Sequence, residues 1–241
     1  MRIDQKGFCI SGFVAILNTH HLKSKKMKKI AVVLAGNGVY DGSEIHEATL
    51  TLLAIANQGA QYQCFAPDIN QAHVINHLTG AEMPETRNVL IEAARIARGN
   101  IKPLTDYKAS EFDAIIFPGG FGVAKNLCTF AFDGINCTVN SEVENAIRST
   151  VVAEKPVGAL CISPVLIAKV LVDVEVTIGK DKGAADAIES FGGTHVETTH
   201  GEIVYDPKYK LVTTPCYMLD ATISQIAEGA DNVVRKILEL A

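Results

Sequence analysis

The sequence predicts one α/β domain in which a mostly parallel sheet is covered by helices on both faces. Short β-branched runs alternate with longer segments of helical period along most of the chain, and this alternation is typical of a parallel sheet with crossover helices. Of the 241 residues, 48% are hydrophobic, which is enough for one sizeable core. We find no internal repeat, so we expect residues 27–241 to form a single domain.

Residues 1–26 differ from the rest of the chain. An apolar run, Phe8–Leu17, is followed by a run of lysines from Lys23 to Lys29. A secretory signal peptide would carry a small-residue cleavage site after its apolar core, and no such site follows here. We expect Met27 to be the native start and residues 1–26 to be an upstream extension or a disordered tail. A targeting peptide is the alternative.

Residues 30–66 predict one βαβ unit. The continuous apolar run Ile30–Ala35 is typical of a buried parallel strand. A helical pattern then extends from Ser43, the expected N-cap, to Gly59. A second strand is expected over Gln61–Ala66, and the unit should have the right-handed crossover of nearly all such folds.

Further elements follow in alternation towards the C-terminus. Helical periods end at glycines or polar turns, and the strands are short apolar runs. The predicted helices are Asn88–Ala97, Glu142–Val152, Ala184–Phe191 and Asp220–Leu240, and the predicted strands are Asp113–Phe117 and Glu175–Ile178, with a hairpin of Ile203–Tyr205 and Lys210–Thr213.

Three loops are candidates for the functional site, because ligands bind at the carboxyl ends of parallel strands. They follow Ala35, Phe117 and Leu160. The first loop holds Gly36, Gly38 and Gly42, but it has one residue too many for a dinucleotide fingerprint. We therefore expect its glycines to let the backbone approach another segment closely, and we expect no cofactor.

The third loop, Gly158-Ala-Leu-Cys-Ile-Ser-Pro164, has the pattern of a nucleophile elbow. Cys161 stands between a strand and a helix, with small residues two positions away on each side. Such a sharp turn exposes the nucleophile at the strand end. The following helix N-terminus should favour the thiolate. A buried structural cysteine is the alternative.

The loop after Phe117 supplies a second part of the site. Adjacent glycines, Gly119 and Gly120, can turn a backbone N–H into the crevice. Together with the N–H of Ile162, the N–H of Gly120 would form an oxyanion hole. An ordinary glycine turn is the alternative.

The motifs DAIIFPGGFG and GALCISP resemble the ThiJ/PfpI group of the class I glutamine amidotransferase-like superfamily. GVYDGSEIHEATLTLLAI, NHLTG, ETRNVLIEAARIARG and LVTTPCYML resemble its ElbB glyoxalase branch more closely. The likeness covers residues 27–241. It implies a flavodoxin-like three-layer sandwich, a homodimer, a nucleophilic cysteine at Cys161 and a carboxylate at Glu47 that faces the thiol.

The resemblance also implies an activity, the conversion of glyoxal to glycolate without glutathione, metal or other cofactor. Ile162 departs from the pattern, because PfpI-type proteins have a histidine after the nucleophile. This departure disfavours an amide hydrolase or amidotransferase. A redox-sensing thiol protein with little catalysis is the main alternative to the enzyme.

Histidines complete the set of candidate residues. His46 and Glu47 point about 100° apart on a helix, so only one can face Cys161, and the resemblance selects Glu47. His195 and His200 are candidate proton shuttles. His73 and His77 have helical spacing but no third ligand nearby, so we expect no metal site.

Composition bears on partners and location. The net charge of −5 disfavours nucleic acid as a partner, and no apolar run is long enough to span a membrane. The six cysteines include no CxxC pair and are expected to be reduced thiols. We expect a cytoplasmic protein that acts on a small dicarbonyl compound.

Overall fold

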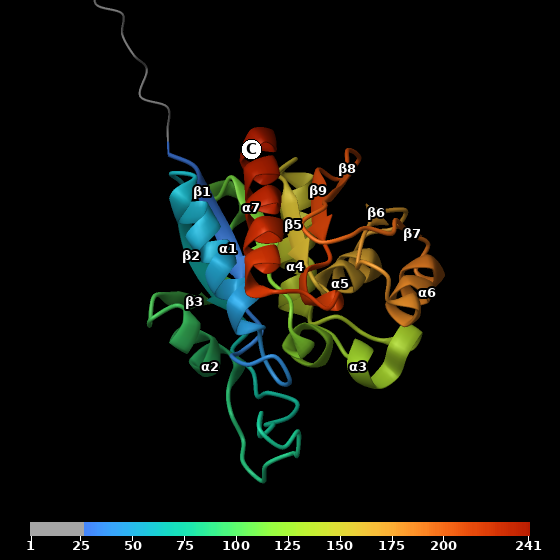
Figure 1. Cartoon of the computed structure of the whole chain (residues 1–241). Coiled ribbons are helices and arrows are strands. Elements are labelled where there is room, and N and C mark those ends of the chain that lie inside the picture. Colours follow the sequence, from blue (N-terminus) through green and yellow to red (C-terminus); the bar gives the residue numbers. More distant parts are fainter. Residues whose placement is uncertain (1–26) are drawn as a thin grey trace, which may run out of the picture.

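The computed structural model describes residues 27–241, and the prediction for residues 1–26 lies outside the described residues. The described chain is a three-layer α/β sandwich around a seven-stranded sheet of order β3-β2-β1-β4-β5-β9-β8 (Figure 1). Only β8 and β9 pair antiparallel in this sheet, which confirms the predicted mostly parallel arrangement. Its strands are β1 (Lys29–Val33), β2 (Gln61–Ala66), β3 (Ile101–Pro103), β4 (Ala114–Phe117), β5 (Val157–Leu160), β8 (Val204–Asp206) and β9 (Leu211–Thr214).

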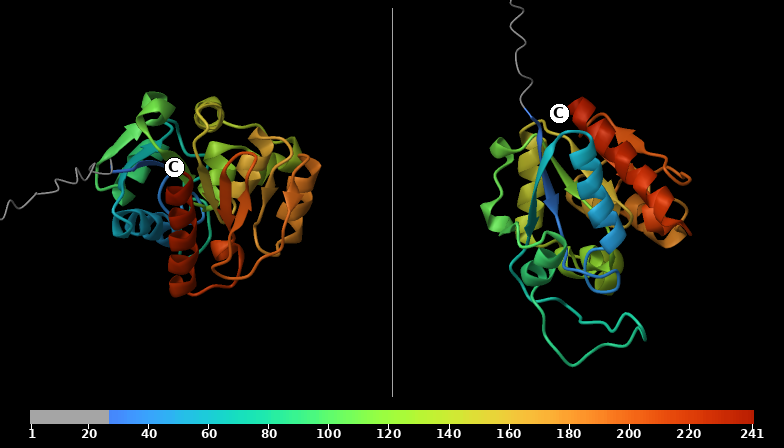
Figure 2. Two further views of the ribbon diagram at one scale, coloured as in Figure 1. Left: turned by 90° about the horizontal axis from the view of Figure 1, so that it is seen from above. Right: turned by 60° about the vertical axis from the view of Figure 1, so that its left-hand side comes forward.

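Helices cover both faces of the sheet. Helices α1 (Ile45–Asn57) and α7 (Ile223–Leu240) lie side by side on one face, and α2 (Val89–Ile96) packs into the same hydrophobic cluster (Figure 2). Helices α4 (Ser141–Val152) and α5 (Ser163–Val170) cover the other face. The short helices α3 (Phe130–Asp133) and α6 (Lys182–Ser190) lie outside these layers (Figure 1).

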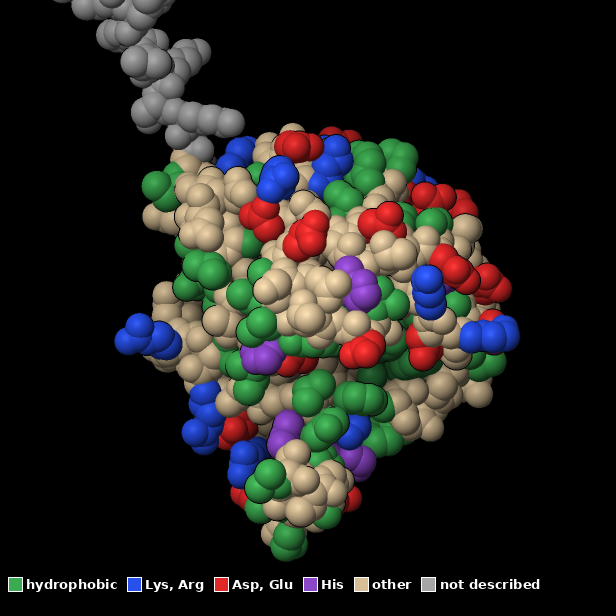
Figure 3. Space-filling model, in the orientation of Figure 1, with side chains coloured by type: hydrophobic (Ala, Val, Ile, Leu, Met, Phe, Trp, Pro, Cys, Tyr) green, Lys and Arg blue, Asp and Glu red, His purple; other side chains and the backbone are tan. Residues whose placement is uncertain are grey.

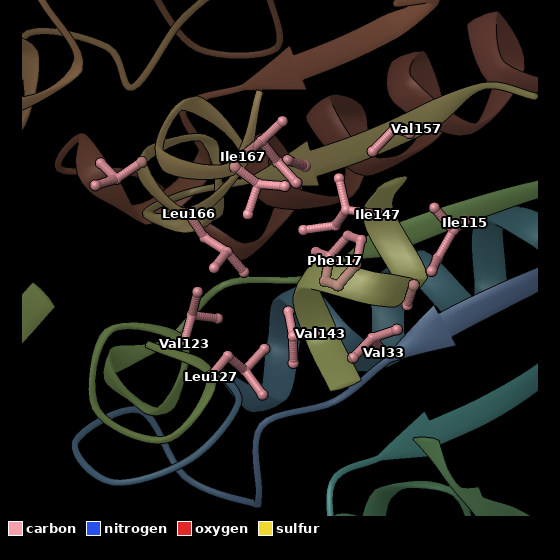
Figure 4. Close-up of a cluster of buried hydrophobic side chains, with 14 of the residues drawn as sticks. Val33, Ile115, Phe117, Val123, Leu127, Val143, Ile147, Val157, Leu166 and Ile167 are labelled. Atoms are coloured by element: carbon pink, nitrogen blue, oxygen red, sulfur yellow. The ribbon is translucent and has the colours of Figure 1, made fainter. Parts of the chain in front are cut away.

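Two hydrophobic cores separate the layers, and β1 contributes to both. Ala31 and Val33 join the cluster under α4 and α5, whereas Ile30 and Val32 join the one under α1 and α7. Figure 4 shows the first cluster, in which β4, α4 and α5 contribute large apolar side chains. Burial on both faces explains why the β1 sequence is continuously apolar instead of alternating.

Some elements differ from the prediction because they are too short to give a periodic signal. The predicted strand Glu175–Ile178 is only β6 (Glu175–Val176), which pairs with the unpredicted β7 (Thr194–His195) in a separate sheet. β3 was also not predicted, and it pairs with β2 at the sheet edge. Residues 71–80 contain no helix, so His73 and His77 share no helix face.

The start of α1 also differs. Glu44, not Ser43, is the N-cap, and its carboxylate accepts the Glu47 N–H at 2.7 Å. The Ser43 hydroxyl instead accepts the N–H of Ala35 at 2.8 Å. This bond joins the beginning and the end of the loop between β1 and α1. Among residues 27–241, no helix has the length and apolarity needed to cross a membrane.

Candidate active site

Loops after β1 and β4 pack backbone against backbone at the carboxyl edge of the sheet. A Cβ atom added to Gly42 would lie 2.2 Å from the Asn37 nitrogen, and one added to Gly120 would lie 2.3 Å from the Glu44 nitrogen. The Gly122 N–H donates to the Gly42 carbonyl at 2.8 Å. The close backbone approach expected of these glycines is therefore confirmed, and no side chain fits at the contact.

Cys161 adopts the strained backbone of a nucleophile elbow. It directly follows β5, its φ is +60°, and α5 begins two residues later at Ser163. A left-handed conformation costs a non-glycine residue about 1 kcal/mol or more, so the surrounding packing must hold it. Gly119 supplies that space, because a Cβ atom there would lie 2.4 Å from the Cys161 Cβ.

Glu47 lies against Cys161 in the protein interior. Its side chain is fully buried, and its carboxylate accepts N–H groups from Gly119 at 3.0 Å and Tyr217 at 3.2 Å. The Cys161 thiol adjoins this carboxylate, since a Cβ atom added to Gly119 would lie 2.6 Å from Glu47 Oε2 and 2.9 Å from Cys161 Sγ. His46 points outward, where Nδ1 lies 2.8 Å from the Tyr217 hydroxyl. As helical geometry requires, only one of the two neighbours faces the thiol.

Burial favours the protonated form of both groups. Desolvation, followed by the charge of Glu44, raises the pKa of Glu47 to about 8, although hydrogen bonds from Tyr217, Cys161 and Gly119 oppose the shift. Desolvation and then the charge of Glu47 raise the pKa of the Cys161 thiol well above its ordinary value. The expectation of a thiolate stabilised by the helix N-terminus is therefore wrong for the free protein, because burial dominates.

Two backbone donors converge on the sulfur. The backbone N–H groups of Gly120 and Ile162 lie close enough to Cys161 to lower the pKa of its thiol against the dominant effect of burial. Gly120 reaches this orientation with a φ of +107°. The predicted pair of oxyanion-hole donors is thus placed together beside the thiol.

The two candidate proton shuttles do not line the cavity at Cys161. His195 lies on β7 in the separate small sheet, with its Nε2 buried and unpartnered. His200 lies 3.0 Å, through Nε2, from the Asp220 carbonyl. The structure therefore brings Cys161 and Glu47 together but neither histidine with them.

Three further residues join the site. Glu44 and Tyr217 line the cavity, and the buried Cys216 is close enough to Glu47 and Cys161 for their charges to raise its pKa, after burial itself. Tyr217 and Cys216 follow β9, which neighbours β5, so their loop lies beside the elbow. This is a fourth loop beside the three candidate loops. In the sequence, Thr-Thr-Pro-Cys at the end of a strand marks it.

The thiol faces a cavity of about 520 Å³. Its walls come from the loops after β1, β4, β5 and β9 and from α3 and α6. No group of three or more His, Cys, Asp or Glu side chains in residues 27–241 is arranged to hold a metal ion. The lining residues are Val39, Glu44, Gly120, Phe121, Ala124, Phe130, Ala131, Cys161, Ile162, Asp181, Gly183, Ala184, Tyr217 and Met218.

Comparison with known proteins identifies similar chains. No family model matches the sequence. The chain is 49% identical over 222 residues to the mitochondrial glutamine amidotransferase-like class 1 domain-containing protein 3 of Homo sapiens, covering 88% of this chain and 83% of the relative. It is 46% identical over 231 residues to the mitochondrial ES1 protein homolog of Rattus norvegicus, covering 92% and 87%.

Solved structures show the same fold. An isoprenoid biosynthesis protein with an amidotransferase-like domain from Ehrlichia chaffeensis aligns with a TM-score of 0.83 and 35% identity, over 88% of this chain and 99% of the other. Glyoxalase III from Candida albicans aligns with a TM-score of 0.58 and 16% identity, over 89% and 97%. The second likeness shows the fold alone. Both confirm the predicted flavodoxin-like sandwich, and the first, with the relatives above, confirms the predicted family.

The predicted cytoplasmic location is wrong. Both relatives just described are mitochondrial proteins, and so is the ES1 protein of Danio rerio, which is 34% identical over 230 residues. The prediction rested on reduced cysteines and on the composition. The five described cysteines are indeed free thiols, but reduced thiols do not distinguish one reducing compartment from another.

Proposed function

Because the chain belongs to the family of glutamine amidotransferase-like class 1 domain-containing and ES1 proteins, within the ThiJ/PfpI superfamily, we propose that it is a glutathione-independent glyoxalase. It would convert glyoxal to glycolate with Cys161 as the nucleophile. The observation that carries this proposal is that the Cys161 thiol at the edge of the cavity adjoins the buried Glu47 carboxyl. Glyoxalase III among the proteins of this fold makes the activity compatible with the scaffold.

The first step is addition of the thiol to one aldehyde carbon of glyoxal. Glu47 in its ionised form accepts the thiol proton as the sulfur–carbon bond forms. The negative charge that develops on the aldehyde oxygen is stabilised by the N–H groups of Gly120 and Ile162, which already converge on the sulfur. Protonation of that oxygen by Glu47 gives a hemithioacetal and restores the carboxylate.

The second step is an internal transfer of hydrogen. Glu47 removes the proton from the carbon bonded to sulfur and, through an enediol, a proton is delivered to the neighbouring carbon. The first carbon is thereby oxidised to a thioester and the second is reduced to a primary alcohol. Water then cleaves the thioester, which releases glycolate and regenerates the thiol, so no external oxidant or reductant is needed.

A carboxyl with a pKa of about 8 suits both steps. Near neutral pH both its protonated and its ionised form are populated. It can therefore accept a proton in one step and return it in the next. The low-dielectric surroundings that shift its pKa also strengthen the hydrogen bonds to the developing oxyanion.

The alternatives gain less support from the site. A peroxide-sensing cysteine is favoured by an accessible, low-pKa thiol. Cys161 is 7% exposed, and burial raises its pKa. An amide hydrolase would need a base such as the histidine for which this chain has Ile162, and neither His195 nor His200 lines the cavity.

Glyoxal turnover tests the proposed activity against the sensor. With excess glyoxal and no glutathione, we expect the amount of glycolate to rise well beyond one equivalent per protein molecule, because the thiol is regenerated. The measurement is glycolate quantified against time by NMR. Glycolate that stops at one equivalent or less, together with rapid peroxide oxidation of Cys161 seen by mass spectrometry, would favour the sensor instead.

We also propose that this protein, like the relatives described above, is mitochondrial, with residues 1–26 as part of the targeting signal. The support is the location printed for those relatives. Subcellular fractionation of the natural source, with intact-mass measurement of the recovered protein, tests it. Recovery in the mitochondrial fraction without residue 1 is expected, whereas a cytosolic protein that retains Met1 would contradict it. The homodimer stays a prediction that sedimentation velocity would test.

A further inference from the structure

We propose that the preferred substrate of this site is an uncharged 1,2-dicarbonyl compound that carries an apolar group about the size of a phenyl ring. This inference rests on the proposed function, since it assumes that Cys161 attacks a dicarbonyl. It adds the identity of the substituent next to the two carbonyl groups, which takes no part in the reaction. Glyoxal would then be a minimal substrate that leaves most of the cavity empty.

The size of the cavity is the first observation. Its volume of about 520 Å³ lies in the range of roughly 300–1,000 Å³ that is common for small-molecule sites. An engineered apolar cavity of about 150 Å³ already holds benzene. A two-carbon dialdehyde at Cys161 would therefore contact only one end of the cavity, and its remaining walls would stay in contact with solvent.

The walls of the cavity are largely apolar. Phe121 and Phe130 contribute aromatic rings, while Ile162 and Met218 contribute aliphatic side chains near the elbow. Alanines at positions 124, 131 and 184 and glycine at 183 leave space between them. Burial of an apolar substituent against such walls stabilises the bound substrate roughly in proportion to the area removed from water.

The charges around the cavity disfavour an anionic substrate. Glu44 and Asp181 are its only ionisable carboxylic residues, and none of the lining residues, all within the described chain, is Lys, Arg or His. Each carboxylate also caps a helix, since Glu44 accepts the Glu47 N–H at 2.7 Å and Asp181 accepts the Ala184 N–H at 2.8 Å. They are therefore held in place as fixed acceptors at the cavity.

Two lysines adjoin lining residues in the sequence, Lys125 and Lys182, and their ammonium groups have other partners. Lys125 donates to the Tyr40 carbonyl at 2.9 Å, and Lys182 pairs with Asp186 at 2.7 Å. On the face of the molecule in Figure 3, basic and acidic side chains are interspersed and form no basic patch. Phosphate or carboxylate groups on a substrate would thus meet two carboxylic residues and no cationic side chain among the residues that line the cavity.

Competing substrates test the inference directly. For the wild-type protein we expect kcat/KM for phenylglyoxal to exceed that for glyoxal by at least tenfold, since even one methylene group in an apolar pocket changes specificity by roughly 10–200-fold. Gly183→Leu is the matching variant. Apart from the backbone of its own helix, a Cβ atom at Gly183 has only Asp181 Oδ1 within 4 Å, at 3.6 Å, so there is room for the leucine at this lining position. It should lower the phenylglyoxal-to-glyoxal ratio severalfold.

Glu189→Leu is the control, because Glu189 is exposed on the same helix and does not line the cavity. It should leave the ratio at its wild-type value. A wild-type ratio near one, or a ratio that Gly183→Leu does not change, would overturn the inference while leaving glyoxal turnover intact. Such a result would separate its failure from failure of the proposed function.

A binding measurement works even without catalysis. Thermal shift of the Cys161→Ala protein should show stabilisation by acetophenone, which is uncharged and cannot undergo the reaction, and none by phenylglyoxylate at equal concentration. The alanine variant prevents covalent addition at position 161. Equal stabilisation by both compounds would overturn the preference for uncharged ligands, and stabilisation by neither would overturn the apolar site.

Discussion

Replacement of Glu47 by glutamine is expected to lower kcat/KM for glyoxal by ~100-fold or more, as loss of a positioned acid–base group does. The amide preserves the size of the side chain, and its oxygen can still accept one of the N–H groups from Gly119 and Tyr217. What it cannot do is accept the thiol proton or carry a proton between the two carbons of the substrate. Steady-state glycolate formation for Glu47→Gln measures the effect.

The pH profile separates this chemical role from a structural one. Since kcat/KM reports on groups of the free enzyme, we expect its value for the wild-type protein to rise with pH up to about 8, the pKa of Glu47. Glutamine cannot titrate, so kcat/KM of the variant should not show this rise with pH. If Glu47→Gln kept both the wild-type kcat/KM and its rise with pH, another group would be the base.

Stability should depend on pH through the same group. The folded protein holds a proton on Glu47 up to about pH 8, whereas the ordinary value for the unfolded chain is 4.5. Stability present below pH 4.5 is therefore lost progressively as the pH rises towards 8, because the unfolded state releases the proton first. Glu47→Gln should flatten this decline in chemical denaturation, and Glu111→Gln, the same change at an exposed position, should not.

Much of the scaffold follows from the sequence because its signals are local or periodic. The β1 run is apolar at every position since both faces of the strand are covered. Small residues around Cys161 predict the elbow, because its steric demands lie within a few residues of the chain. Glycines after β1 and β4 predict a close backbone contact, although not the partner that each loop meets.

The rest of the site depends on how distant segments meet. Tyr217 reaches the cavity because β9 lies beside β5, and this neighbourhood is fixed by sheet order, which the local pattern does not encode. Glu44 becomes an N-cap because Ser43 bonds to Ala35 instead. His195 and His200 were chosen by their position after the elbow, but His195 lies on β7 of the separate small sheet and His200 lies in a turn, and neither lines the cavity.

The protonation state of Cys161 shows the same limit. A helix N-terminus can be read from the sequence and argues for a thiolate. Whether the thiol is surrounded by water or by other side chains is a property of the packed structure. Here the thiol is 7% exposed and adjoins a carboxyl, so burial outweighs the local donors.

A serine at position 161 tests the nucleophile itself. The hydroxyl is smaller and far less nucleophilic than a thiol at this pH, so Cys161→Ser should lower glycolate formation by ~100-fold or more. Cys137→Ser is the matched control, because Cys137 is a buried thiol that does not line the cavity. The same chemical change there should leave turnover within a factor of about two, as expected of a substitution remote from the reacting atoms.

The most direct measurement is therefore glycolate formation from glyoxal, without glutathione, by the wild-type protein, Cys161→Ser and Cys137→Ser at equal concentration. The account predicts sustained turnover by the wild-type and Cys137→Ser proteins and a loss of ~100-fold or more for Cys161→Ser. Full activity of Cys161→Ser would contradict the account, because the thiol at the elbow would then not be the group that attacks the substrate.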